Sequence, residues 1–265
     1  MKQYRVSPGQ KVKLGEIDPN DTHLVPGGKA AAENQSEALP EKLAQLQELL
    51  YASHEHRILV VLQGMDTSGK DGTIRHVMSG FNPASTRVAS FRKPSLEELD
   101  HDYLWRVHHQ VPAKGEIAVF NRSHYEDVLV VRVHNLVPKA VWKKRYDHIR
   151  AFEQMLVDEG TVLLKFFLHI SRDEQRRRLQ ARVDDPTKRW KFQHGDIEER
   201  ELWDQYQEAY EVALEKTSTD DAPWYIVPAN HKWYRNHVVA SVLVSALEDL
   251  HMKYPEPDLS DITIT

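Results

Sequence analysis

The sequence predicts an α/β protein in which helices pack on both faces of a parallel β-sheet. Short, almost continuously apolar runs such as residues 58–62 and 162–170 indicate strands that are buried on both faces. Longer segments between these runs have the apolar spacing of helices. The first run leads directly into Gly64-Met65-Asp66-Thr67-Ser68-Gly69-Lys70, which has the glycine and lysine spacing of a phosphate-binding loop.

The chain divides into an arm, one large domain and a tail. Residues 1–35 are polar and contain several prolines and glycines, so we expect an extended N-terminal arm. A single domain is expected at 36–250, and residues 251–265 are expected to form a C-terminal tail. The domain opens with Glu37–Ser53, whose leucines recur at helical spacing. We expect this amphipathic helix to pack on the core, with an oligomer contact as the alternative.

The remaining elements follow from capping signals and apolar runs. Ser95–Glu98 and Ser171–Glu174 match the capping box that begins a helix. Residues 128–133 are apolar except for Arg132, and periodicity does not distinguish strand from helix there. The other strands of a five-stranded sheet are expected at 87–91, 116–120, 162–170 and 224–227, and the other helices at 140–158, 196–216 and 234–250.

Composition excludes several classes of protein. The chain has no cysteine, which rules out disulfides, thiolate nucleophiles and cysteine-bound zinc. A net charge of -5 argues against general nucleic-acid binding. We therefore expect no nucleic-acid partner. The sequence has no apolar run long enough to span a membrane and no apolar signal core, so we also expect a cytoplasmic protein without a membrane partner. The 15 histidines show no metal-binding motif. Core or lid packing is expected for Trp190, Trp203, Trp224 and Trp233.

The phosphate-binding loop departs from the usual pattern at one position. Its glycines let backbone N–H groups surround an anion, and Lys70 supplies a mobile positive charge. Asp71 stands where this motif usually has Ser or Thr, whose hydroxyl binds magnesium. With Asp66, two carboxylates therefore flank the phosphate site. They would repel a phosphate unless a cation lay between them, so we expect Mg²⁺ as a cofactor, with Mn²⁺ as an alternative.

A second polar segment, residues 121–127, follows the third predicted strand. Ligands of parallel sheets bind at the carboxyl ends of the strands, so this segment should lie beside the phosphate-binding loop. Glu126 or Asp127 could hold magnesium there, and Arg122 could neutralise charge on a transferring phosphoryl group. The alternative is that these are solvated surface charges.

An arginine-rich stretch lies between residues 172 and 191. Arg178 and Arg182 are four residues apart and share a helical face, on which Glu174 should pair with Arg178. Solvation alone commonly explains a run of charge. A phosphate-binding loop requires an anionic ligand, however, so we expect a helical lid at about residues 172–200 that closes over phosphates and excludes water.

Together, these motifs resemble the type-two polyphosphate kinase family. The likeness rests on residues 64–72, 120–127 and 178–191, continues through 222–225, and covers nearly the whole chain beyond the arm. The aspartate after the loop lysine distinguishes this family from ordinary nucleotide kinases, and the sequence is most similar to class III members. The resemblance implies a thymidylate-kinase-like, three-layer P-loop fold with a helical lid and a magnesium requirement. It also implies phosphoryl transfer between polyphosphate and AMP or ADP, which makes ATP from AMP.

The resemblance also implies roles for individual residues. Asp66 and Asp127 are expected to hold Mg²⁺, and Asp66 to orient the attacking phosphate oxygen. That oxygen is already anionic, so positioning and charge stabilisation should dominate catalysis. Neutralisation of the transferring group is expected from Lys70, Arg122, Arg178 and Arg182. Further phosphate or nucleotide contacts are expected from Gly64, Thr67, Ser68, Gly69, Lys70, Asp71, Gly72, Thr73, Arg75, Asn121, Glu126 and Arg189.

Two other functions fit part of this pattern. A nucleoside monophosphate kinase with ATP as donor shares the fold and the lid, but Asp71 and the paired loop carboxylates count against it. A non-catalytic nucleotide- or polyphosphate-binding module would need neither the lid arginines nor Asp127. We expect a homo-oligomer, a dimer or a tetramer, and we expect residues 87–106 to read the base because they follow the second strand.

Overall fold

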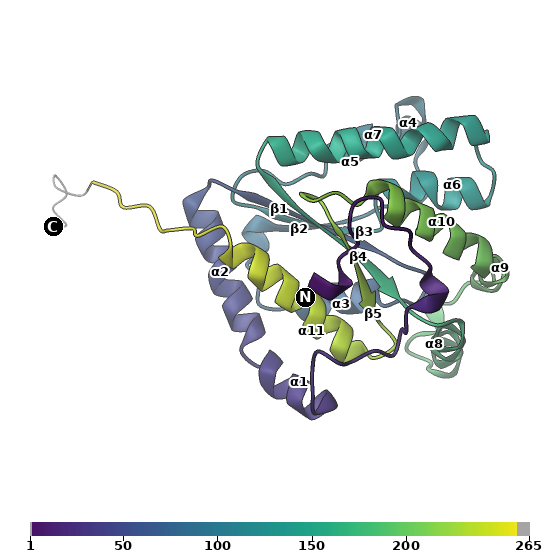
Figure 1. The fold of residues 1–265 in the computed structure, drawn as a ribbon, viewed down its shortest axis with the longest axis horizontal. Helices are drawn as coiled ribbons and strands as arrows, with labels where there is room; N and C mark the ends of the chain where they lie inside the picture. Colours follow the sequence, from purple (N-terminus) through teal and green to yellow (C-terminus); the bar gives the residue numbers. More distant parts are fainter. Residues whose placement is uncertain (1, 259–265) are drawn as a thin grey trace.

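Five parallel strands form the central sheet of the computed structural model, which describes residues 2–258 (Figure 1). In spatial order they are β2 (Thr86–Ser90), β3 (Ile117–Asn121), β1 (Arg57–Gln63), β4 (Thr161–His169) and β5 (Trp224–Pro228). All neighbouring pairs are parallel. The sequence places each strand to within one residue at either end, and the predicted α/β class is confirmed. The inner strands are covered on both faces, which explains their continuous apolar runs.

Helices form a layer on each face of the sheet (Figure 1). One layer contains α1 (Gly28–Ser36), α2 (Leu39–Ser53), α3 (Lys70–Val77) and α11 (Lys232–Glu248). The other contains α6 (Val130–Val133), α7 (Lys139–Asp158) and α10 (Trp203–Thr217). Leu43 and Leu50 of α2 are buried, and α2 packs along α11, as the leucine spacing predicts. No helix within residues 2–258 is both long enough and apolar enough to cross a membrane.

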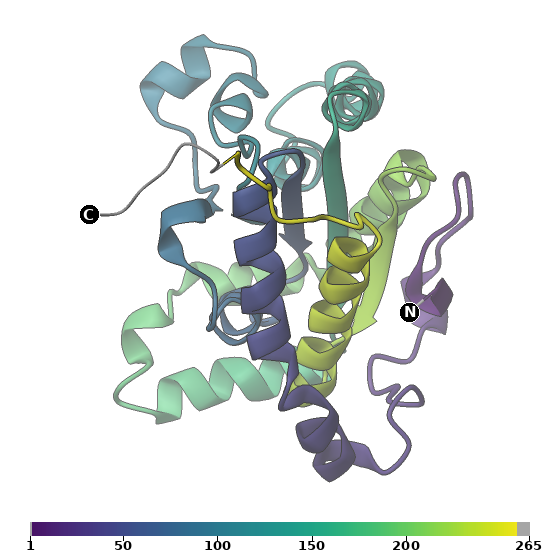
Figure 2. The same cartoon turned by 90° about the vertical axis from the view of Figure 1, so that its left-hand side faces the viewer.

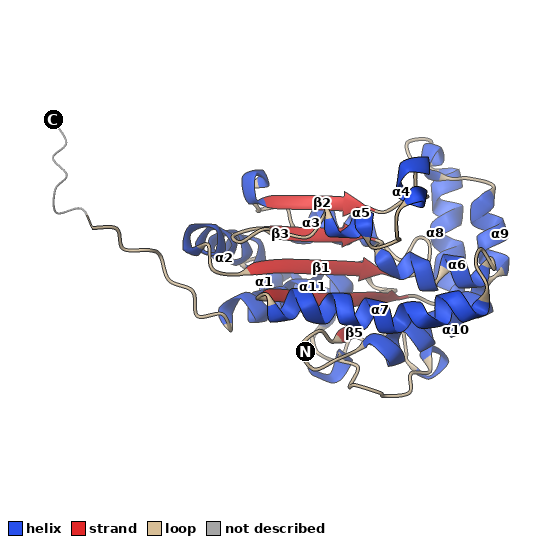
Figure 3. Cartoon of the chain, turned by 90° about the horizontal axis from the view of Figure 1, so that it is seen from above, coloured by secondary structure: helices blue, strands red, loops and turns tan. Residues whose placement is uncertain are grey.

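Shorter elements lie at the ends of the strands. Periodicity does not distinguish strand from helix for the run at 128–133, and in the structure its residues belong to helices and the turn between them. Two predicted helices are interrupted. The helix predicted at 196–216 breaks at Leu202. The helix that the Ser95 capping box begins, which the spacing of Leu99, Tyr103, Leu104 and Val107 predicts to be continuous, breaks at His101, and beyond it the Asp102 carboxylate accepts the Leu104 N–H at 2.9 Å and begins a new turn. The remaining helices are η3 (Pro83–Ser85), α4 (Leu96–Asp100), α5 (Trp105–His108), η4 (His124–Val128), α8 (Arg172–Asp184), η5 (Arg189–Lys191) and α9 (Gly195–Glu201). Figure 3 shows α8 and α9 beyond the carboxyl ends of the strands.

The N-terminal arm lies against the domain rather than in solvent (Figure 2). Its only regular elements among residues 2–27 are η1 (Lys2–Tyr4) and η2 (Leu14–Glu16). The Val6 N–H donates to the Trp224 carbonyl at 2.8 Å, so the arm covers the free edge of β5. The arm predicted to extend to residue 35 ends sooner, because the alanine-containing segment from Gly28 forms α1.

Beyond α11 the chain continues without regular secondary structure through residue 258. The rest of the predicted tail, residues 259–265, lies outside the described residues.

Candidate active site

The phosphate-binding loop, residues 64–69, connects β1 to α3 at the carboxyl edge of the sheet. Its backbone turns through two left-handed residues, Thr67 at φ 64° and Gly69 at φ 104°. A Cβ atom at Gly69 would lie 1.7 Å from Nη1 of Arg235, so only glycine fits this position. The loop ends at the N-terminus of α3, where free backbone N–H groups favour an anion.

Several loop side chains are arranged to receive a ligand. The hydroxyl groups of Thr67 and Ser68 are buried and have no hydrogen-bond partner in the described chain. Lys70 folds back over the loop, and its Nζ donates to the Gly64 carbonyl at 2.7 Å. Desolvation inside the loop, with a contribution from nearby Arg122, lowers the pKa of Lys70 to about 8. The lysine therefore carries its charge at neutral pH.

The segment that follows β3, residues 121–127, meets this loop as the strand-end rule predicts. Arg122 has left-handed backbone, with φ 61°, and its Nη2 lies 3.0 Å from Asp66 Oδ1. Its Nη1 lies 3.5 Å from Glu126 Oε2. The Asn121 amide donates to Asp71 Oδ1 at 2.7 Å, so the unusual aspartate of the first loop contacts the second loop.

Asp127 contacts a residue that sequence analysis missed. Arg145 of α7 donates to Asp127 Oδ1 at 2.8 Å and to its backbone carbonyl at 3.1 Å. Burial raises the pKa of Asp127 to about 6, against the opposing effect of Arg145 and Arg106. Arg145 gave no sequence signal, because a charged residue on a long helix is usually solvated.

The carboxylates suit magnesium that is shared with a substrate. Among residues 2–258, no group of three or more His, Asp or Glu side chains is placed to hold a metal alone. Mg²⁺ commonly takes one or two carboxylates and completes its shell with water and substrate phosphates. Asp66 and Asp127, the two carboxylates predicted to hold the ion, are donors of this kind, and in the structure they pair with Arg122 and Arg145. A metal with an all-protein shell would need further ligands.

Arg178 of α8 is paired with Glu174, as predicted, at 2.6 Å from Nε to Oε1. Its two terminal nitrogens donate to four backbone carbonyls at 2.6 to 3.0 Å, those of Thr67, Ser68, Ala229 and Asn230. A guanidinium group has five N–H donors, and all five are used here. In this structure Arg178 therefore holds the loop by its carbonyls and has no free donor for a phosphate, unlike the direct contact that was predicted.

The start of α8 differs from a complete capping box. The Ser171 hydroxyl accepts the Glu174 N–H at 3.1 Å, as expected. The reciprocal bond is replaced: the Ser171 N–H donates to Asn230 Oδ1 at 3.0 Å, and the Glu174 carboxylate binds Arg177 and Arg178. Asn230, in the loop before α11, therefore accepts the N-cap N–H that the Glu174 carboxylate would accept in a complete capping box.

The rest of the segment 172–201 is more exposed. Arg182 lies 3.7 Å from Asp196, and Arg189 donates to the Val183 carbonyl at 2.7 Å, so both contact their own segment. Lys191, which was not predicted, reaches the first loop and lies 4.0 Å from Asp71. Two other predicted binding residues differ in placement: Thr73 is buried and donates to the Gly69 carbonyl, and Arg75 is exposed on α3.

Arg235 is a second buried arginine that sequence analysis missed. It is 2% exposed, and Nη1 donates to the Ser68 carbonyl at 3.3 Å. Its Nη2 and Nε donate to Asn236 Oδ1 at 2.8 and 3.1 Å. Burial, together with Arg178, lowers its pKa. The available signal was one charged residue beside the apolar face of the last predicted helix.

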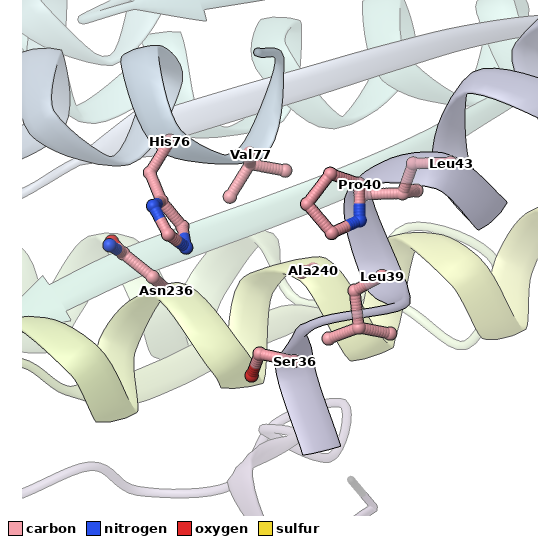
Figure 4. A pocket seen from close by; sticks show the side chains of 8 residues that line it. All are labelled: Ser36, Leu39, Pro40, Leu43, His76, Val77, Asn236 and Ala240. Carbon is pink, nitrogen blue, oxygen red and sulfur yellow. The ribbon is translucent and has the colours of Figure 1, made fainter. Parts of the chain in front are cut away.

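Two hollows lie outside this constellation. A cavity of about 10 Å³ lies between α2, α3 and α11, and Figure 4 shows His76 and Asn236 facing each other at one end of it. This volume suits one water molecule. A cleft of about 360 Å³ between α5 and α7 is lined by Trp105, His108 and Phe152 among others. Three residues of this cleft, Asp102, Leu104 and Trp105, belong to the segment 87–106 that is predicted to read the base. None of the predicted catalytic, phosphate-binding or metal-binding residues lines either hollow.

A phosphate-binding loop at the carboxyl edge of a parallel sheet, beside a second loop with arginine and carboxylates, defines a P-loop phosphotransferase. The chain belongs to the polyphosphate kinase 2 family, whose family model matches residues 28–255. The resemblance seen in the sequence is thereby confirmed. The N-terminal arm lies outside the matched region.

Full-length relatives agree with this assignment. A Meiothermus ruber protein named AMP/ADP-polyphosphate phosphotransferase is 62% identical over 258 residues, which is 97% of each chain. An ADP-polyphosphate phosphotransferase of Rhodopseudomonas palustris is 48% identical and covers 96% of this chain and 92% of its own. The crystal structure of polyphosphate kinase 2 from Arthrobacter aurescens has a TM-score of 0.93 at 44% identity, and the match covers 97% of this chain and 92% of that one.

Proposed function

We propose that this protein transfers phosphoryl groups from inorganic polyphosphate to AMP and ADP, in a reversible and magnesium-dependent reaction that forms ADP and ATP. The observation that carries the proposal is the meeting of the two loops, which brings Lys70 and Arg122 to one edge of the sheet together with Asp66. The full-length relative named AMP/ADP-polyphosphate phosphotransferase supports the choice of donor and acceptors.

The reaction needs little covalent chemistry from the protein. An oxygen of the nucleotide's terminal phosphate attacks the terminal phosphorus of polyphosphate, and the bond from that phosphorus to the bridging oxygen breaks. The shortened polyphosphate leaves with the electron pair of that bond. Backbone N–H groups of the phosphate-binding loop, with Lys70 and Arg122, stabilise the charge on the transferring group.

The remaining residues hold this arrangement in place. Asp66 and Asp127 would bind Mg²⁺, which supplies further positive charge at the phosphates when it is bound. Arg178 and Arg235 hold the backbone of the phosphate-binding loop by donating to its carbonyl groups. The exposed part of the segment 172–201, with Lys191 near Asp71, acts as the lid that excludes water. Base reading by residues 87–106, assembly into a dimer or tetramer and a cytoplasmic location stay predictions.

Replacement of Lys70 by Ala tests the proposal. Loss of a charge-stabilising donor in a dry site should lower kcat by about 100- to 1000-fold while the protein stays folded. The assay supplies Mg²⁺, AMP and either polyphosphate or ATP as donor, and follows ADP and ATP by chromatography. Lys143→Ala, which removes an exposed cation from α7, is the control and should leave the rate unchanged.

Each result of this assay has a distinct meaning. Formation of ADP and then ATP from polyphosphate supports the full proposal. A reaction that stops at ADP contradicts the use of ADP as an acceptor. Turnover with ATP alone as donor contradicts the proposed donor, and normal turnover by Lys70→Ala contradicts the role of the lysine.

A further inference from the structure

We infer that a buried ion pair, Glu153 with Lys165, is a positioning device that fixes the segment 121–127 for phosphoryl transfer through the hydroxyl group of Tyr125. This inference rests on the role proposed above for Arg122. The residues concerned form a buried network below the segment. They are His124, Tyr125, Glu153, Lys165 and Thr217, and each is at most 2% exposed.

The Glu153 carboxylate joins the ion pair to the catalytic segment. Lys165 Nζ on β4 donates to Glu153 Oε2 on α7 at 2.6 Å. The other carboxylate oxygen, Oε1, accepts the Tyr125 hydroxyl at 2.7 Å and lies 3.1 Å from Nε2 of His124. One carboxylate therefore binds two consecutive residues of the segment, while a lysine from the central sheet fixes the carboxylate.

The Tyr125 hydroxyl is the centre of the network. Besides its bond to Glu153, it accepts from Lys165 Nζ at 3.2 Å and lies 2.9 Å from Thr217 Oγ1. Lys165 also donates to the Thr217 carbonyl at 2.6 Å. Because the chain holds this hydroxyl from β4, α7 and α10 at once, the position of Tyr125 is determined by three separate elements.

Stability alone is a poor explanation for this arrangement. Removing two charges from water costs free energy that their attraction often does not recover, so an apolar replacement of a buried ion pair is frequently neutral or stabilising. The pair orients its neighbours, because hydrogen bonds to a fixed carboxylate set the positions of the groups that make them. The groups that it orients are the side chains of His124 and Tyr125, which follow Arg122 in the chain.

The backbone of Arg122 shows why that orientation matters. A non-glycine residue in the left-handed region is strained and keeps this conformation only where its surroundings impose it. Ser123 follows it, and its hydroxyl accepts from Gln63 Nε2 at 3.2 Å. With Tyr125 fixed two residues later, the chain holds Arg122 in the turn that brings its guanidinium group 3.0 Å from Asp66.

Tyr125→Phe tests the inference with a small change, since it keeps the ring and removes the hydroxyl. We expect kcat with polyphosphate and AMP to fall about tenfold and both KM values to change less than about twofold, because alignment is lost and binding is not. Tyr146→Phe is the matched control: it is a buried tyrosine on α7 whose ring packs against Trp142, and it should keep the normal kcat. A normal kcat in Tyr125→Phe would overturn the inference.

A double-mutant cycle distinguishes positioning from a general structural role. If Tyr125 acts through Arg122, adding Tyr125→Phe to Arg122→Ala should lower kcat no further. Independent, multiplying losses would overturn the inference. If Arg122→Ala alone keeps the normal kcat, the proposed role of Arg122 fails and the inference fails with it. A normal kcat in Tyr125→Phe beside an impaired Arg122→Ala rejects the inference alone.

A paired replacement removes the charges themselves and guards against misfolding of the single variant. Glu153→Gln with Lys165→Met leaves an amide oxygen as acceptor for Tyr125 but removes its fixed direction. We expect a thermal midpoint within about 4 °C of the parent, since a buried pair adds little net stability. The same variant should lose about tenfold in kcat. An unchanged kcat in this folded variant would contradict the inference.

Discussion

The two loops at the carboxyl edge of the sheet are supported by different kinds of contact. The phosphate-binding loop, residues 64–69, has arginine side chains bound to its outer carbonyl groups, from α8 and from α11. The segment 121–127 is held from below by side chains buried in the core. Both follow neighbouring parallel strands, so the difference lies in the supports and not in the topology.

The outer support has a direct chemical consequence for the first loop. Within one trans peptide the C=O and the N–H point in opposite directions. Arg178 binds the Ser68 carbonyl at 2.9 Å, so the N–H of Gly69, which belongs to the same peptide, points away from Arg178. A loop that binds phosphate through its backbone therefore gains from cations on its carbonyls, even though these cations touch no phosphate.

The second loop binds through side chains, which requires another kind of support. The roles proposed for Arg122 and Asp127 require that the backbone that carries them is fixed, and on the inference above the buried network provides this together with Arg145, which binds Asp127. The comparison of the two loops also shows that the two halves of α8 differ in burial. Its first part, with Glu174, Gln175 and Leu179 buried, supports the phosphate-binding loop, and the part beyond it is more exposed.

Among the variants that test this comparison of the two loops, Arg178→Lys has the largest expected effect, and it separates charge from geometry. Lysine keeps the positive charge but lacks the five-donor fork. If the loop is held by its carbonyls, as the structure shows, kcat/KM for polyphosphate should fall about 100-fold, because misplacement of a loop by about 1 Å has that effect. Steady-state kinetics measures the change.

Arg177→Lys is the control for this variant, because Arg177 binds the same Glu174 but is exposed. Its kinetics should be close to those of the parent protein. Retention of most activity by Arg178→Lys would show that charge alone is needed, and would restore the direct phosphate contact predicted from the sequence.

A second experiment targets the close contact between the phosphate-binding loop and Arg235. Gly69→Ala would place a Cβ atom 1.7 Å from Nη1 in a residue with φ 104°. Strain and overpacking together should lower the free energy of unfolding by about 3 kcal/mol. Urea denaturation measures this, and kcat/KM should fall as well because the loop must shift.

Gly72→Ala, three residues further along the chain in α3, provides the matched comparison. Its added Cβ would lie 3.3 Å from Nη2 of Arg235, without a left-handed backbone, so the loss of stability should be below about 1 kcal/mol. Equal stabilities for the two variants would show that the contact between Gly69 and Arg235 does not constrain the loop.

The same contrast explains which parts of the molecule the sequence could predict. Strands covered on both faces have apolar runs that mark their limits, and the strand-end rule then places Asp66 and Arg122 at one edge. The partners of Arg178 could not be predicted, because Ala229 and Asn230 lie about 50 residues away and contribute backbone carbonyls, which every residue has. Arg145 and Arg235 were missed because each contacts the site only through the tertiary fold.

The smallest expected effect is a change of kcat/KM with pH. This measurement tests whether Lys70, beside the phosphate-binding loop, is the cation that titrates. With a pKa of about 8, Lys70 is charged below that pH and loses its charge above it. We therefore expect kcat/KM, which reports the free enzyme, to fall above about pH 8 and to approach a tenfold loss per pH unit.

The position of this alkaline limb should depend on the ligand and on the residue. Bound phosphates favour the charged lysine, so the limb in kcat should lie at higher pH than the limb in kcat/KM. Arg122 of the second loop does not titrate in this range. Lys70→Arg should consequently keep its residual activity constant to at least about pH 10. If the limb stayed near pH 8 in that variant, its origin would be another group, and the charge that titrates would not belong to the phosphate-binding loop.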